Sequence, residues 1–156
     1  MELAPRTSLS YVRLAFARLL AVAERLGEPL VNERPLGAHT NSVAALITHC
    51  CGVCEFWLGH VGLGRPSHRD REREFTATAS LADLHDLVEA TVVQVSADLD
   101  ALEHAPASPN AAARVHLIDA DRSDASLVLH VVEELFQHAG HAELAADALG
   151  ARQEPA

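Results

Sequence analysis

Apolar side chains recur at helical spacing in four segments of this chain, and no segment shows the apolar–polar alternation that indicates a half-buried strand. The four segments are residues 8–27, 40–62, 80–102 and 123–149. Leu, Val and Ala supply most of their apolar positions, and this residue mix favours helix. Helices of about 20 residues are about 30 Å long. The pattern therefore predicts an all-α fold, an up-down four-helix bundle.

Residues with strong positional preferences mark where these helices begin. The candidate N-caps are Thr40 or Asn41, Ser80, and Ser123 or Asp124. Asp83 follows Ser80 at the spacing of a capping box. The polar stretch 63–79 has no sustained periodicity and is expected to be a loop, and the structure of residues 111–123 is ambiguous from sequence.

Length, charge and cysteine content indicate the number of domains, the expected partners and the compartment of the protein. Its 156 residues are expected to form one domain over 1–150, with a loose tail at 151–156. The formal net charge of −10 repels phosphate backbones, so no nucleic-acid partner is expected. The N-terminal apolar run contains arginines, unlike a signal peptide, and no uncharged apolar run is long enough to span a bilayer. A cytoplasmic protein without a membrane partner is expected, and three cysteines crowded into one turn fit a reducing compartment.

The stretch "HVVEELFQHAGHAEL" gives the fourth helix a row of metal-binding side chains. His130, Glu134 and His138 follow one another at four-residue intervals, which stacks them on one helix face. The second helix offers His49, one position from the centre of its apolar stripe. If the two helices are neighbours, His49, Glu134 and His138 can converge. Two imidazoles and a carboxylate are standard ligands of zinc, nickel or iron(II), and three protein ligands leave a position for water or substrate.

The other histidines around this stripe have less certain roles. His141 lies about 60° around the helix from His138, so it is expected to flank the site and could replace Glu134 as a ligand. His130 is expected at most to support a ligand. An accidental stripe remains an alternative, because the chain contains 10 histidines.

Two further groups of residues could carry chemistry. Cys51 and Cys54 form a C-x-x-C, but mid-helix and without the strand–helix–strand setting of a thioredoxin-like site, which favours buried core residues. Arg69 and Arg71, together with Arg73, could grip an acidic substrate or cofactor. The alternative for these arginines is a solvated loop of mixed charge, since Asp and Glu alternate with them.

Two blocks of the sequence resemble a known family. "TNSVAALITHCCGVCEFWLGHVGLGRPSHRDREREF" is similar to the second helix and following loop of the DinB-like helical bundle superfamily, and "HVVEELFQHAGHAEL" is similar to its last motif. The nearest branch is that of the mycothiol-dependent maleylpyruvate isomerase. The isomerase carries a further C-terminal domain that this chain is not expected to have, which counts against its specific reaction.

The resemblance implies a divalent metal, zinc or nickel in first place, held by His49, Glu134 and His138. It also implies that the metal activates a low-molecular-weight thiol such as mycothiol or bacillithiol for attack on a small electrophile. A homodimer is expected from the same precedent and from an apolar patch around Phe56 and Trp57.

Three functions compete at this point. The first is a metal-dependent thiol S-transferase or isomerase. The second is a metal- or small-ligand-binding bundle without catalysis. The third is a structural or regulatory dimer whose site has decayed, and the intact set of three metal-binding side chains argues against it. The residues do not separate the first two.

Overall fold

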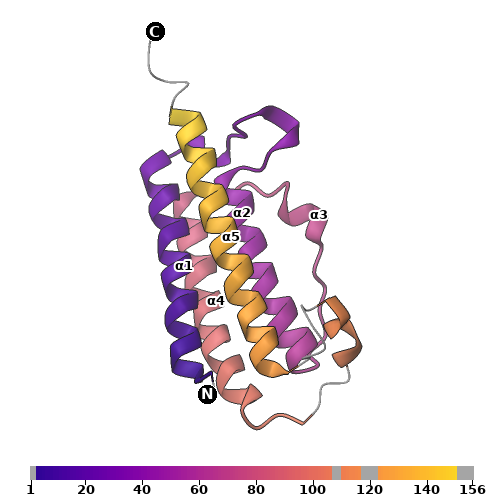
Figure 1. The fold of residues 1–156 in the computed structure, drawn as a ribbon. Coiled ribbons are helices and arrows are strands. Elements are labelled where there is room, and N and C mark those ends of the chain that lie inside the picture. The colour runs from indigo at the N-terminus through magenta and orange to yellow at the C-terminus, as the bar shows by residue number, and fades with distance from the viewer. Residues whose placement is uncertain (1–2, 107–109, 117–122, 151–156) are drawn as a thin grey trace.

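A computed structural model describes residues 3–106, 110–116 and 123–150. Its four long helices are α1 (Pro5–Leu26), α2 (Val43–Cys54), α4 (Leu81–Leu102) and α5 (Asp124–Gly150), and they pack side by side in one bundle (Figure 1). These described residues contain no strand. The predicted all-α helical bundle is confirmed.

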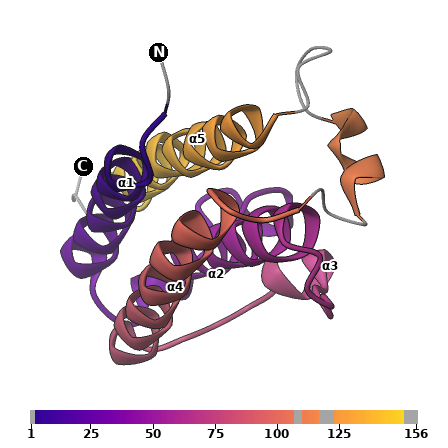
Figure 2. The same cartoon turned by 90° about the horizontal axis from the view of Figure 1, so that it is seen from below.

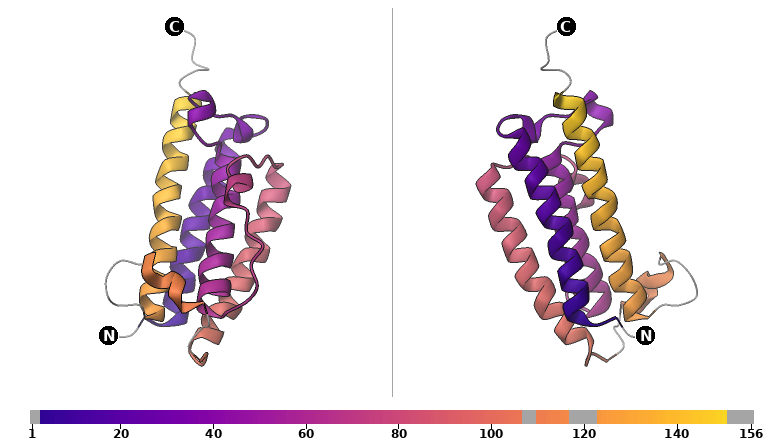
Figure 3. Two further views of the ribbon diagram at one scale, coloured as in Figure 1. Left: turned by 90° about the vertical axis from the view of Figure 1, so that its right-hand side faces the viewer. Right: turned by 60° about the vertical axis from the view of Figure 1, so that its left-hand side comes forward.

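The directions of the helices depart from simple up-and-down alternation. α1 and α5 run one way along the bundle, whereas α2 and α4 both run the other way (Figures 1 and 3). The segment after α2 makes this possible, because it returns along the whole length of the bundle and carries the short helix α3 (Arg71–Glu74) on its way. Seen down the bundle in Figure 2, α2 lies between α5 and α4 and contacts both. The two sides of α2 therefore face different neighbours.

The beginnings of two helices test the predicted caps. Ser80 accepts a hydrogen bond from the backbone N–H of Asp83, and the Asp83 side chain accepts from the Ser80 backbone, so the capping box is confirmed. For α2 the predicted cap was wrong, because the N-cap is Ser42, whose side chain accepts from the N–H of Ala45. The Thr40 hydroxyl is used elsewhere, since it donates to Gly37 O in the preceding 3₁₀ turn η2 (Gly37–His39).

Other connections contain short helical turns that periodicity did not reveal. The turn η1 (Leu30–Asn32) follows α1, and η4 (Ala111–His116) forms part of the segment that was ambiguous in sequence. The rest of that segment before Ser123, and the predicted C-terminal tail, lie outside the described residues.

The second predicted helix changes its winding halfway. After Cys54 the chain continues as a π-helical segment, η3 (Glu55–Gly62), in which the N–H of Leu63 reaches back to Leu58 O over 3.1 Å. Gly59 in this segment has no side chain to block Arg65, because a Cβ atom there would overlap the Arg65 guanidinium. The segment is longer than the single turns of π-helix that are frequent at functional sites, and it leads directly into the long connection.

An ion pair between the partly exposed Arg65 and the buried Asp98 fixes the start of the long connection to α4. Arg65 donates from both terminal nitrogens to the Asp98 carboxylate, with an Nη2–Oδ2 distance of 2.8 Å. Asp98 is 2% exposed and also accepts from Gln94 Nε2 at 2.8 Å. The pair satisfies a carboxylate that would otherwise be buried alone.

Removing this arginine is expected to destabilise the fold. Arg65→Ala leaves Asp98 buried with Gln94 as its remaining side-chain partner, and should lower the free energy of unfolding by about 2–3 kcal/mol. Arg25→Ala is the control, because the Arg25–Asp147 pair is 57% and 66% exposed and such pairs contribute about 0–1 kcal/mol. Urea unfolding measures both variants, and equal losses would contradict the proposed role of burial.

The apolar character of the second predicted helix is explained by its position in the core. Residues 37–62 are long and apolar enough to cross a membrane by length and composition, but 78% of their most apolar 18-residue window, whose mean hydropathy is 1.4, is buried inside the bundle. Trp57 is buried and Phe56 half-buried, so these two residues do not form the expected exposed apolar patch. The prediction of a homodimer therefore rests only on the family precedent.

Candidate metal centre

His49, Glu134 and His138 converge between α2 and α5. One nitrogen or oxygen atom from each side chain lies within 4.8 Å of those of the other two. The rings of His49 and His138 are nearly perpendicular, with centroids 4.7 Å apart. Glu134 and His138 share a face because they are four residues apart on α5, and that face meets α2 where His49 projects. The predicted convergence of these three residues is thus present in the structure.

The cluster is buried on the α2 side and more open on the α5 side. His49 is 2% exposed, whereas the side chains of His138 and Glu134 are 15% and 26% exposed. The cluster is therefore partly exposed to solvent on the α5 side. The Phe75 ring stacks on His49 at a centroid distance of 4.3 Å and closes another side.

Glu74 orients the His49 ring. His49 Nδ1 donates to Glu74 Oε2 over 2.8 Å, so Nε2 is the ring nitrogen whose lone pair is available. Arg69 in turn holds Glu74 through two hydrogen bonds, Nε to Oε1 at 2.7 Å and Nη2 to Oε2 at 2.9 Å. A carboxylate on the outer nitrogen of a metal-binding histidine fixes the ring and makes it a better ligand.

Gly52 makes room for this carboxylate. A Cβ atom at Gly52 would overlap Glu74 Oε1 and come within 3.2 Å of Arg69 Nε. The role of Glu74 was not predicted from the sequence, because the R-D-R-x-x-E-F motif that contains it was interpreted as a solvated loop of mixed charge. The missed signal was the Phe that follows Glu74, because an apolar residue in such a loop indicates that this end of it packs against the bundle.

Burial keeps both rings of the cluster neutral. It is the main cause that lowers the pKa of His49 and the pKa of His138 below the ordinary histidine value, and it outweighs the nearby carboxylates Glu74 and Glu134, which raise them. Neutral imidazole is the form that binds metals. In addition, His138 Nδ1 is buried and has no hydrogen-bond partner among the described residues. The donor set and this ring nitrogen fit a divalent ion such as zinc, nickel or iron(II).

The two other histidines of α5 lie on either side of the cluster. The His130 ring packs edge-on against Trp57 at a centroid distance of 4.6 Å, and it forms a second close group with Glu133 and Glu134. The exposed His141 stacks near His138 with ring centroids 6.2 Å apart. Neither belongs to the group formed by His49, Glu134 and His138.

The arginines proposed from sequence to bind substrate have protein partners in the structure. Arg69 is largely buried and engaged with Glu74. Arg71 lies over the Phe75 ring, 5.4 Å from its centroid, and is exposed. A role for either in substrate binding stays a prediction, and Arg71 has the more accessible guanidinium.

The cysteines are buried, free thiols, as expected from their position in the second predicted helix. Burial is the main cause that raises the pKa of Cys51 to about 12, and it also raises the pKa of Cys50 and that of Cys54. The thiolate is the reactive form. All three side chains are therefore expected to be inert in the folded protein.

Alkylation tests this expectation. At pH 8 iodoacetamide should leave Cys50, Cys51 and Cys54 unmodified in the native protein and modify all three in urea, because unfolding restores their ordinary pKa. Peptide mass spectrometry locates the label. Rapid modification of Cys51 in the native state would show that its thiol is accessible and ionisable.

The match to a family sequence model places the chain in the class of DinB-like helical bundles, which its two sequence blocks resemble. Within that class the chain belongs to the mycothiol-S-transferase family, whose sequence model matches residues 7–149. No curated protein and no solved structure matches the chain significantly.

Proposed function

We propose that the protein is a divalent-metal-dependent S-transferase that joins a low-molecular-weight thiol, such as mycothiol, to a small electrophile. Membership of the mycothiol-S-transferase family supports the reaction class. The observation that carries the metal dependence is the convergence of His49, Glu134 and His138 within 4.8 Å. Zinc and nickel are the metals we propose first, because both accept two imidazoles and a carboxylate.

The residues of the chain divide the work of such a site. His49 through Nε2, Glu134 through its carboxylate and His138 through its ring would hold the metal. A bound divalent ion favours the thiolate over the thiol at neutral pH. Glu74 fixes the tautomer of His49, and Arg69 holds the Glu74 side chain in place through two hydrogen bonds. The Phe75 ring provides an apolar wall that limits water on the His49 side of the cluster, and Trp57 packs against the neighbouring His130.

The overall reaction balances without an oxidant. The thiol loses its proton, the sulfur forms one bond to carbon, and either a leaving group such as a halide departs or a double bond or epoxide takes up the proton.

A metal-binding bundle without catalysis is the alternative. The observation in its favour is the second group, His130, Glu133 and Glu134, because it shares Glu134 with the cluster and offers further donors nearby. Additional protein ligands would close the position that a thiol needs.

A rate measurement separates the two functions. The protein loaded with zinc or nickel should accelerate the reaction of mycothiol with monochlorobimane, followed by fluorescence, relative to the metal-free protein and to the uncatalysed reaction. His39→Ala, at an exposed residue outside the site, should keep the rate. Tight metal binding without acceleration would favour the non-catalytic alternative, and absence of metal binding would refute both.

Metal affinity is expected to depend on pH in a defined direction. A proton and a metal ion compete for each ring nitrogen, so affinity falls once the rings protonate. Since burial lowers the pKa of His49 and of His138 from 6.5, affinity for zinc should be nearly constant from pH 8 to 6.5 and fall below that. Competition with a zinc-binding dye, corrected for the pH dependence of the dye, measures this. A fall that begins well above pH 7 would contradict the lowered pKa values.

A further inference from the structure

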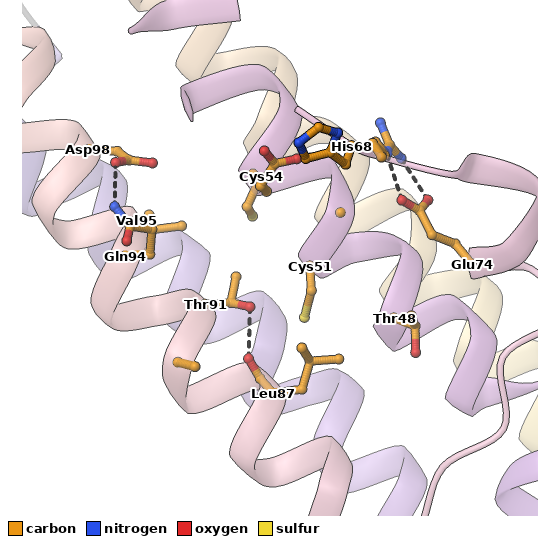
Figure 4. Close-up of a pocket in the computed structure, with 14 residues that line it drawn as sticks. Thr48, Cys51, Cys54, His68, Glu74, Leu87, Thr91, Gln94, Val95 and Asp98 are labelled. Carbon is orange, nitrogen blue, oxygen red and sulfur yellow. Dashed lines mark hydrogen bonds and ion pairs between the residues drawn. The ribbon is translucent and has the colours of Figure 1, made fainter. Parts of the chain in front are cut away.

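A cavity of about 550 Å³ lies between α2 and α4, beside the long connection that follows η3. α2 contributes Thr48, Cys51 and Cys54 to its walls, and α4 contributes Leu87, Thr91 and Val95 (Figure 4). Its volume falls within the range of about 300–1,000 Å³ that is typical of small-molecule sites. The proposed S-transferase reaction assigns no role to this cavity.

The cavity is separate from the candidate metal centre. None of His49, Glu134 and His138 lines it. The Glu74 and Arg69 side chains do line it, and Glu74 is the residue that holds His49 from the cavity side. A molecule in the cavity would therefore be separated from the available nitrogen of His49 by the ring itself and by the Arg69–Glu74 pair.

Two of the three carboxylates that line the cavity, Asp98 and Glu74, are paired with arginines, and the third, Glu55, accepts a hydrogen bond from Ser67 Oγ at 3.0 Å. Asp98 is paired with Arg65 and bonded to Gln94, as Figure 4 shows for the second contact. Glu74 is paired with Arg69 through two hydrogen bonds. Asp98 and Glu74 therefore offer a ligand little uncompensated charge.

The uncharged polar groups inside the cavity are also largely satisfied. The hydroxyl of Thr48 donates to Ala44 O at 2.9 Å, and that of Thr91 donates to Leu87 O at 2.8 Å. Cys51 and Cys54 are buried free thiols. An apolar side chain, Leu87, remains 38% exposed next to this recess. A ligand that covers it and fills the recess would remove apolar surface from water without breaking these hydrogen bonds.

We propose that the cavity between α2 and α4 binds one uncharged, largely apolar small molecule, at a site distinct from the metal centre. The largely apolar walls and the pairing of Glu74 and Asp98 with arginines both favour a neutral ligand over an anion or a cation. This inference does not depend on the S-transferase activity or on a bound metal.

Fluorescence of 1-aminoanthracene, an uncharged apolar probe, tests the proposal. The metal-free protein should bind one equivalent with an increase in fluorescence. Ala90→Phe on α4 and Thr48→Phe on α2 place a ring at the cavity from opposite walls, and each should weaken binding at least about tenfold by occupying the space of the probe. Ala82→Phe is the matched control, because Ala82 is exposed on the same helix as Ala90 but does not line the cavity, and it should keep the affinity.

Three results would overturn the proposal. The first is no saturable binding by the native protein. The second is equal affinity in all three variants, with circular dichroism showing that each is folded. The third is a dimer in light scattering that Ala90→Phe converts to a monomer while the native protein excludes the probe, because a second copy of the chain would then fill the cavity. Because the titration uses metal-free protein, it can succeed or fail independently of the proposed S-transferase function.

Discussion

Replacing His138 with alanine is expected to abolish tight metal binding. The ring of His138 is one of three donors whose atoms lie within 4.8 Å of one another, and its loss leaves His49 and Glu134 alone. Loss of a residue that only supports a ligand typically costs about 10–100-fold in metal affinity, and loss of a ligand itself should cost more. Isothermal titration with zinc, followed by metal analysis of the dialysed protein, measures the effect.

The same substitution tests whether the protein remains folded. His138 is partly exposed at the surface of α5, and alanine is the best helix former, so the circular dichroism spectrum should be unchanged. His141→Ala is the matched control, because His141 is three residues away on the same helix but outside the close group. If His141→Ala lost as much zinc affinity as His138→Ala, the ligand set would have to be revised. If neither variant lost affinity, the metal would lie elsewhere.

The four long helices, and the pairing of Glu134 with His138 on one helix face, were predictable from sequence because both depend on local spacing. Glu134 and His138 are separated by one helical turn, so their shared face follows from the geometry of α5 alone. The capping box at Ser80 is similarly local. The prediction that His49 joins them required one assumption, that α2 and α5 are neighbours. The structure shows that these two helices are in contact.

The features that sequence analysis did not predict depend on contacts between residues far apart in the chain, which helical spacing does not reveal. Glu74 reaches His49 across 25 positions, and Arg65 reaches Asp98 across 33. Charged residues in a polar stretch resemble a solvated loop until the packing of that loop is known. The parallel directions of α2 and α4 were also hidden, since periodicity predicts each helix but not the path of the connection between them. The cavity between these helices follows from that path.

Gly52→Ala is expected to weaken metal binding although it leaves all three proposed metal ligands unchanged. A Cβ atom at position 52 would overlap Glu74 Oε1, so the Glu74 carboxylate would have to move away from the α2 backbone. His49 Nδ1 would then lose the acceptor that fixes its tautomer. The expected result is a loss of about 10–100-fold in zinc affinity, the range for removal of a carboxylate behind a metal-binding histidine. Glu74→Gln should fall in the same range, since it removes the charge that Arg69 also binds.

Helix propensity alone predicts that Gly52→Ala should stabilise the protein, whereas the overlap with Glu74 should destabilise it. Alanine is favoured over glycine inside a helix by about 1 kcal/mol. Gly140 on α5 is the matched control, because a Cβ atom there meets nothing within 4 Å. Gly140→Ala should therefore raise the free energy of unfolding by about 0.5–1 kcal/mol and leave zinc affinity unchanged. Gly52→Ala should forfeit that gain, because overlap in a packed region costs about 1–3 kcal/mol. Urea unfolding and zinc titration of the two variants separate these effects. If Gly52→Ala stabilised the protein as Gly140→Ala does and kept its zinc affinity, Glu74 would not be the group that positions His49.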